Sequence, residues 1–266
     1  MIVFAFGEGV NGYLAAFASG GLYKLVECPL CFNRPRRVLR MGPQVLSEFP
    51  QQDNYSRSLV SQYQPRIVAS PPLDLWLISS KISEIKAAYE ILEKEFGKLD
   101  VLVNNAGIGP PNAIEDVTEE DFDYTVEVNL KGTFFVSQYA GKLMKRNKYG
   151  RIVNLSSQAG FIALPTESVY CMTKAGIAHL TKCFAVEWGK YNITVNAVAP
   201  TFIYTPGTEE ALADADFKAD VIERIAGLHR IGEPMEVAGA VVFLASPAAS
   251  LITGDTLMID GGWTAR

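Results

Sequence analysis

The sequence predicts one α/β domain with a doubly wound parallel sheet and an atypical amino-terminal portion. Two observations carry this prediction. From residue 79 onward, short apolar runs typical of buried strands alternate with longer stretches of helical periodicity, and strands separated by helices form parallel sheets. The length of 266 residues suits one domain with a sizeable core better than two small domains.

The first elements of this pattern lie between residues 79 and 144. An apolar stripe with helical spacing predicts a helix that ends at Gly97, and a buried strand is expected over residues 99–103. Thr118 followed by Asp121 resembles a capping box, which predicts a long helix from there towards Met144. The apolar stripe consists of Ile82, Ile85, Tyr89, Leu92 and Phe96.

The second half of the chain continues the alternation. A buried strand at residues 152–155 precedes a helix at 167–188, which is stopped by Gly189. The remaining predicted elements are a strand at 193–198, a helix near 216–225, a helix at 235–245 and a strand at 256–259. The helices between these strands are long enough for the crossovers that a parallel sheet requires.

Three polar side chains are expected to meet at the carboxyl end of the strand at 152–155. Ser157 follows that strand closely, at the edge where open α/β sheets bind their ligands. Tyr170 and Lys174 are four positions apart on the next predicted helix, so their side chains leave the same helix face. The three residues together predict a site for proton transfer.

The chemistry of these residues depends on the pKa of the Tyr170 phenol. An ordinary phenol, with a pKa of about 10, is a poor acid–base catalyst at neutral pH. At about 5 Å and an effective dielectric constant near 20, the Lys174 ammonium would stabilise the phenolate by roughly 3 kcal/mol, which lowers the pKa by about two units. Tyr170 would then exchange a proton with a substrate oxygen that Ser157 holds. Because tyrosine and lysine at this spacing form a weak motif alone, Ser157 carries part of the prediction.

Further motifs surround these residues in a defined order. They are Asn104-Asn105-Ala106-Gly107 after a strand, Asn129 in VNLKGTFF, NAVAP at residues 196–200, and Asp260-Gly261-Gly262 near the end. In this order and spacing, residues 79–266 resemble the short-chain dehydrogenase/reductase family. The resemblance implies a Rossmann-like fold and NAD(P)-dependent hydride transfer between nicotinamide and a carbonyl or alcohol carbon.

The resemblance also implies roles for the matching residues. Tyr170 would donate or accept the proton, and Ser157 would hold the reacting oxygen. Lys174 would lower the pKa of Tyr170 and bind the nicotinamide ribose, and Asn129 would anchor a water molecule. The cofactor, NAD or NADP, would contact Asn104, Ala106, Gly107, Tyr170, Lys174, Pro200, Ile203 and Thr205.

The residue types at some of these positions have a physical explanation, while others allow an alternative role or depart from the family pattern. Ala106 and Gly107 lack side chains that would block a cofactor's approach to the backbone. Asn104 has an alternative role as a structural residue that ties strand ends together. Thr201 stands where the family usually has glycine, which stiffens the turn after Pro200.

The resemblance implies an enzyme that interconverts a secondary alcohol and a ketone. The segments EWGKYNITVNAVAP and DGGWTAR look most like those of sugar-acid and polyol dehydrogenases, with 3-oxoacyl reductases as the nearest alternative. The pocket for this small-molecule substrate is expected at residues 158–164 and 204–228. Because family members are usually homotetramers or homodimers that bury their long helices and last strand, the same assembly is expected here.

Residues 1–78 do not match the family. The Gly-rich turn that receives the cofactor pyrophosphate should fall near residues 29–36, where PLCFNRPR contains no glycine. Seven of the fourteen prolines also lie in this segment, and they break any helix long enough to cover a parallel sheet. The chain therefore divides into an atypical segment at 1–78 and a catalytic portion at 79–266. A shifted reading frame or a fused foreign segment would explain this boundary, and a non-catalytic protein without a cofactor cradle is the alternative function.

A second candidate for the cofactor cradle lies at the start of the chain. Residues 2–6 have the composition of a strand, the run from Gly7 to Gly12 matches GxGxxG, and Glu27 stands about where a ribose-binding acid belongs. The helix between them would be only about eight residues long and interrupted by glycines. A glycine-rich loop that binds no phosphate is therefore the alternative.

Composition limits the partners and the compartment. A net charge of −5 and a pI near 5.2 argue against a nucleic-acid binder, and no apolar run is long enough for a membrane span. The apolar start lacks a basic n-region, so a soluble cytoplasmic protein is expected. No metal site is expected, because Cys28 and Cys31 lack a second cysteine pair and His179 and His229 are isolated.

Overall fold

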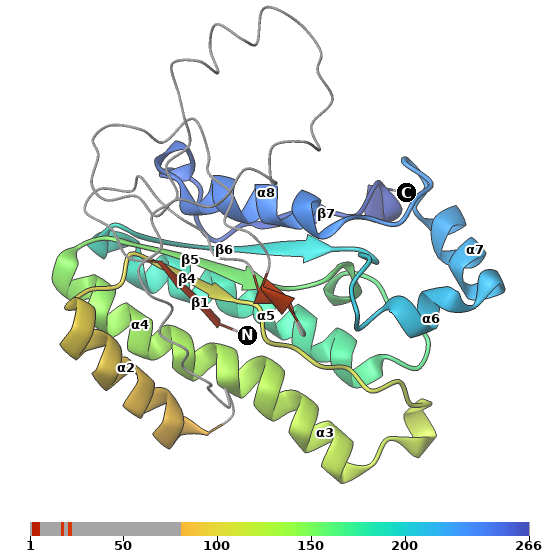
Figure 1. Ribbon diagram of the computed structural model, residues 1–266, viewed down its shortest axis with the longest axis horizontal. Coiled ribbons are helices and arrows are strands. Elements are labelled where there is room, and N and C mark those ends of the chain that lie inside the picture. Colours follow the sequence, from red (N-terminus) through yellow and green to blue (C-terminus); the bar gives the residue numbers. More distant parts are fainter. Residues whose placement is uncertain (1, 6–16, 19–20, 23–80, 266) are drawn as a thin grey trace, which may run out of the picture.

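The computed structural model describes residues 2–5, 17–18, 21–22 and 81–265, and in this part of the chain the predicted α/β class is confirmed (Figure 1). A five-stranded sheet has the order β1-β4-β5-β6-β7, and helices cover both of its faces. Four neighbouring strands are parallel, as the alternating pattern predicts. They are β4 (Val101–Asn104), β5 (Gly150–Leu155), β6 (Ile193–Pro200) and β7 (Thr256–Ile259).

Two hydrophobic layers lie between the sheet and its helices. These helices are α2 (Ile82–Phe96), α4 (Thr133–Asn147), α5 (Ser168–Trp188) and α8 (Pro234–Ala245). Three of them, α2, α4 and α5, cover one face, and α8 covers the other (Figure 1). Along β4, Leu102 joins the cluster below α2, α4 and α5, whereas Val101 and Val103 join the cluster below α8. Burial on both faces explains the continuous apolar runs of the strands.

Two helix boundaries, the end of α2 and the start of α3, lie where the sequence predicts them. Gly97 follows α2 with a φ of 70°, a left-handed conformation that favours glycine, and its N–H donates to the Glu93 carbonyl. Thr118 precedes α3 (Glu119–Val126), and its hydroxyl accepts a hydrogen bond from the Asp121 N–H. The first two predicted helix boundaries are therefore confirmed.

The prediction of one long helix after Thr118 is wrong in one respect, because the helix is not α-helical throughout. A π-helix, Glu127–Gly132, separates α3 from α4, and Asn129 lies inside it with no exposed surface. A π-turn inserts an extra residue into the helical ladder and is frequent at functional sites. Hydrophobic spacing did not reveal it because the helix continues on both sides in nearly the same direction (Figure 1).

The strand β1 (Ile2–Ala5) pairs with β4 in the antiparallel direction. Ala5, at its carboxyl end, pairs with Val101, at the amino end of β4. A cofactor cradle at the GxGxxG run would need a first strand parallel to β4, with its carboxyl end beside Asn104. Because β1 is antiparallel to β4, the interpretation of residues 7–12 as the cofactor cradle is wrong. The interpretation also required a short helix before residue 21, whereas the described residues there form two strands, β2 (Phe17–Ala18) and β3 (Gly21–Leu22), which pair in the antiparallel direction. The glycines from 7 to 12, Glu27 and residues 29–36 lie outside the described residues.

The remaining helices follow β6 and complete the carboxyl-terminal part. α6 (Glu209–Ala213) and α7 (Ala215–Arg224) pack with Trp263 in a third hydrophobic cluster. Within residues 81–265, the short 3-10 helices are Ile114–Asp116, Gln158–Gly160, Gly189–Tyr191, Pro247–Ala249 and Trp263–Ala265. In the described part of the chain, no helix has both the length and the apolar composition for crossing a membrane.

Candidate active site

The structure brings Ser157, Tyr170 and Lys174 together at the carboxyl ends of the parallel strands. Ser157 follows β5, while Tyr170 and Lys174 lie on the first two turns of α5. A side-chain hydrogen bond joins Ser157 to Tyr170, and the Lys174 Nζ atom lies 5.4 Å from the centroid of the Tyr170 ring. The Ser157 hydroxyl also accepts a hydrogen bond from the Ala159 N–H at 3.2 Å, which orients it at the strand end.

The pKa of Tyr170 lies above its ordinary value, so the lowering predicted from Lys174 is not found. Burial of the phenol disfavours the phenolate and is the largest cause. The hydrogen bond to Ser157 acts in the opposite direction, while the electrostatic interactions with Glu167 and then Cys171 also raise the pKa of Tyr170. The local spacing could not show this, because desolvation of the phenol depends on elements that pack around α5 from elsewhere in the chain.

Lys174 is a buried ammonium with only 4% of its surface exposed. Its Nζ atom donates a hydrogen bond to the Leu155 carbonyl at 2.8 Å, at the end of β5. Burial lowers the pKa of Lys174 to about 8, because the charged form loses its hydration. The ammonium is therefore held at a defined position between the strand end and the Tyr170 ring.

This pKa predicts a pH-dependent stability that a Lys174→Met variant lacks. The unfolded chain binds a proton at Lys174 up to about pH 10.4, whereas the folded chain loses it near pH 8. The free energy of unfolding of the natural protein, relative to the variant, should therefore rise with pH by roughly 2 kcal/mol from about pH 7.5 to 9.5. Urea denaturation of both proteins across this window measures the difference, and a difference that stays constant would contradict the lowered pKa.

Asn129 fastens the segment after β4 to the helices. Its side-chain oxygen accepts from the Ile108 N–H at 2.9 Å, and its amide donates to the Ile108 carbonyl at 2.8 Å and to the Thr173 hydroxyl at 2.9 Å. The π-turn thus presents Asn129 between the loop and α5. Thr173 is a residue that the sequence analysis missed, although its position one before Lys174 offered a signal.

The backbone at Gly107 leaves room for a cofactor beside the ammonium. A Cβ atom at Gly107 would lie 3.1 Å from Lys174 Nζ and 3.6 Å from Asn129 Oδ1, so a side chain there would fill the space over both groups. Gly107 is exposed and Ala106 is half-buried at the end of β4. This bare surface fits the nicotinamide end of NAD or NADP, and Tyr170 and Lys174 would face it.

The other predicted cofactor residues lie at the end of β6 and in the turn after it, on the same edge of the sheet. The Pro200 carbonyl lies 3.5 Å from the Ser157 hydroxyl, which brings the ends of β5 and β6 together. The Thr208 hydroxyl donates to the Ile203 carbonyl at 2.6 Å and accepts from the Thr205 N–H at 3.0 Å. Thr208 therefore shapes the turn of Ile203 and Thr205, a role that the sequence analysis missed.

The side chain of Asn104 is engaged in a buried structural network. Its amide donates to the Ser137 hydroxyl at 2.9 Å and to the Asn154 side-chain oxygen at 2.8 Å. Asn154 in turn donates to the Thr181 hydroxyl at 2.9 Å. This chain of bonds ties β4 and β5 to α4 and α5, so the structure favours the structural alternative for the Asn104 side chain over a cofactor contact.

Two glycines that the sequence analysis missed hold the catalytic helix close to its neighbours. A Cβ atom at Gly109 would lie 2.7 Å from the Tyr170 ring, and one at Gly160 would lie 2.8 Å from the backbone of Lys174. Their position shortly after the strands β4 and β5 was the available signal. The ring and the backbone of α5 can approach these loops only because the side chains are absent.

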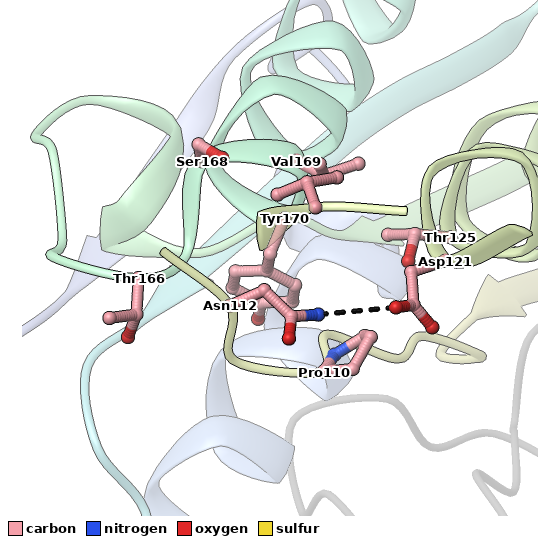
Figure 2. A pocket seen from close by; sticks show the side chains of 9 residues that line it. Pro110, Asn112, Asp121, Thr125, Thr166, Ser168, Val169 and Tyr170 are labelled. Carbon is pink, nitrogen blue, oxygen red and sulfur yellow. Dashed lines mark hydrogen bonds between the residues drawn. The ribbon is translucent and has the colours of Figure 1, made fainter. Parts of the chain in front are cut away.

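The substrate pocket is predicted at residues 158–164 and 204–228, and part of the first segment packs into the core. Ile162 and Leu164 of this segment, with Phe202 after β6, pack against the third hydrophobic cluster. A small pocket lies on the α3 side of Tyr170, where Figure 2 shows Asn112 donating to Asp121 beside the Tyr170 ring. This pocket is lined by Pro110, Asn112, Val117, Asp121, Thr125, Thr166, Ser168, Val169 and Tyr170.

The catalytic portion of the chain is similar in sequence to known proteins. A family model described as enoyl-(acyl carrier protein) reductase matches residues 79–264. An NAD-dependent glycerol dehydrogenase from Listeria innocua is 40% identical over 207 residues, which cover 78% of this chain and 81% of that protein. A D-threitol dehydrogenase from Mycolicibacterium smegmatis is 38% identical over 69% of this chain and 70% of that protein. The crystal structure of a gluconate 5-dehydrogenase from Burkholderia cenocepacia, in complex with NADP and tartrate, covers 71% of this chain and 73% of its own, with a TM-score of 0.69 and 33% identity.

Proposed function

Because the chain belongs to the short-chain dehydrogenase/reductase family, an NAD(P)-dependent oxidoreductase family, we propose that it interconverts a secondary alcohol and a ketone with Tyr170 as the acid–base residue. The observation that carries this proposal is the hydrogen-bonded pair of Ser157 and Tyr170 beside the buried Lys174 ammonium, next to the bare backbone of Gly107. Bound NAD or NADP would accept or supply the hydride.

The residues of the chain would handle the proton and the substrate oxygen. Ser157 would donate a hydrogen bond to that oxygen and hold it against the Tyr170 phenol. Tyr170 is neutral at pH 7, as an ordinary phenol is, and the neutral form is the one that donates a proton to a carbonyl oxygen during reduction. Lys174 and Asn129 would keep the loop after β4 and the strand end at fixed positions around this transfer.

The substrate that we propose is a polyol or a sugar acid. Glycerol dehydrogenase, D-threitol dehydrogenase and gluconate 5-dehydrogenase are similar to this chain over more than two thirds of their lengths. A 3-oxoacyl substrate has less support, because it rests on the sequence resemblance alone, and the matching family model is described by a different reaction, that of an enoyl-(acyl carrier protein) reductase. The enzyme would act in the cytoplasm.

A homotetramer or homodimer is the assembly that we propose. α4 and α5 expose large apolar side chains, with Phe134 at 37% and Val186 at 85% exposure, and the last strand exposes Leu257 at 38%. Apolar surface on long helices and an edge strand is the kind that subunits bury. We also propose a boundary between residues 78 and 79, and the start of the family match at residue 79 supports it.

Cofactor binding followed by turnover tests the proposed function. Titration of the full chain with NADH and with NADPH, followed by nicotinamide fluorescence, should show saturable binding of at least one dinucleotide. Initial rates with glycerol, D-threitol and gluconate should then show reduction of the oxidised cofactor. Binding of neither dinucleotide would identify a non-catalytic protein, and turnover of only 3-oxoacyl thioesters would identify the alternative activity.

A further inference from the structure

Glu167 is a half-buried carboxylic acid near Tyr170 whose side chain has no partner among the described residues. It occupies the N-cap position of α5, yet its side chain makes no capping hydrogen bond. Its backbone N–H donates to the Leu164 carbonyl, and its own carbonyl accepts from the Cys171 N–H. Within the described part of the chain, neither carboxyl oxygen of Glu167 accepts a hydrogen bond.

Glu167 lies at the start of the helix that carries Tyr170. It precedes Tyr170 by three residues, a spacing that places two side chains on the same side of a helix start. Its charge acts on the Tyr170 phenol, and burial raises its own pKa to about 7. A partly desolvated carboxyl group without a partner is costly, and a ligand hydroxyl that donates to it would offset that cost.

The segments around Tyr170 have no free cation that would receive a negatively charged substrate. Residues 105–130 contain seven acidic residues, residues 156–173 contain Glu167, and neither segment contains lysine or arginine. The Lys174 ammonium donates to the Leu155 carbonyl, and Lys218 lies over the Tyr204 ring. The carboxylate of a sugar acid is usually bound by arginine or lysine, whereas the hydroxyls of a polyol need an acceptor such as a glutamate.

We infer that Glu167 determines substrate specificity: it accepts a hydrogen bond from a hydroxyl of a neutral polyol, next to the carbon that reacts at Tyr170, and it disfavours sugar acids. This inference rests on the proposed function and narrows its substrate class. Because its pKa is about 7, the Glu167 carboxyl group is mostly ionised at about pH 8. A hydrogen bond between a hydroxyl and a charged acceptor contributes more than one between neutral groups, so the preference should be measurable in kinetics at that pH.

The matched pair D-threitol and D-threonate tests this inference, because the two differ in a single terminal group. The natural protein should have a higher kcat/KM for threitol. In Glu167→Gln, kcat/KM for threitol should fall about tenfold, mainly through KM, while that for threonate should rise. Glu187→Gln, an exposed position at the other end of α5, is the control and should match the natural protein. Equal effects of Glu167→Gln on both substrates, or a preference of the natural protein for threonate, would overturn the inference.

A direct binding measurement keeps the inference testable when turnover is absent. With 13C-labelled glutamate, the carboxyl resonance of Glu167 is identified by its loss in Glu167→Gln, and threitol should shift it while threonate should not. The lack of a shift with threitol would overturn the inference. The proposed function fails separately, when neither dinucleotide binds to the natural protein.

Discussion

A Tyr170→Phe variant should lose turnover by a factor of about 10² to 10⁴ while its dissociation constants for NADH and NADPH stay nearly the same. The reason is that phenylalanine retains the ring that packs against Gly109 but has no hydroxyl to exchange a proton or to bond Ser157. The measurements are kcat with a polyol substrate and fluorescence titration with each dinucleotide.

Tyr124→Phe provides the matched control for this experiment. Tyr124 lies on α3 with 55% of its surface exposed, so the same loss of a hydroxyl there should leave kcat unchanged. A kcat for Tyr170→Phe within about twofold of that of the natural protein would show that Tyr170 transfers no proton in the rate-limiting step.

Replacing Gly160 with alanine should destabilise the fold and disturb the catalytic centre together. The new Cβ atom would lie 2.8 Å from the Lys174 carbonyl carbon and 2.9 Å from the Ala175 nitrogen, and the backbone of a helix cannot move aside as a flexible side chain can. We expect the free energy of unfolding to fall by about 1 to 3 kcal/mol. Because α5 would shift away from Ser157, kcat should fall as well.

Gly239→Ala separates this steric effect from the general effect of the substitution. Gly239 lies within α8, and a Cβ atom there meets nothing within 4 Å. Alanine favours a helix over glycine, so this variant should gain up to about 1 kcal/mol. Urea denaturation of both variants measures the two changes, and a Gly160→Ala protein as stable as the natural one would contradict the close contact of the loop with α5.

The part of the candidate site that depends on local sequence patterns could be predicted from the sequence. Tyr170 and Lys174 share a helix face because the α-helix repeats every 3.6 residues, and Ser157 follows a continuous apolar run that only a buried strand explains. The structure brings these three residues together, and it places Asn129 and Gly107 beside Lys174. Their functional roles stay predictions until the variants are measured.

Other features of the site could not be predicted from neighbouring residues. The π-turn around Asn129 continues a helix whose hydrophobic spacing looks uninterrupted. Asn104 finds its partners at Ser137 and Asn154, which lie 33 and 50 positions away in the sequence. The raised pKa of Tyr170 follows from burial under several elements, and the spacing to Lys174 alone suggested the opposite direction.

By itself, the sequence determined the α/β class of residues 79–266, the order of helices and strands, and the identity of the residues that meet after β5. The tertiary structure decided the antiparallel direction of β1, the hydrogen-bond partners of Asn104 and Asn129, and the protonation behaviour of Tyr170 and Lys174. The physical reason is that periodicity records which face of each element is buried. Strand pairing, hydrogen-bond partners and desolvation instead depend on residues that only the folded chain brings together.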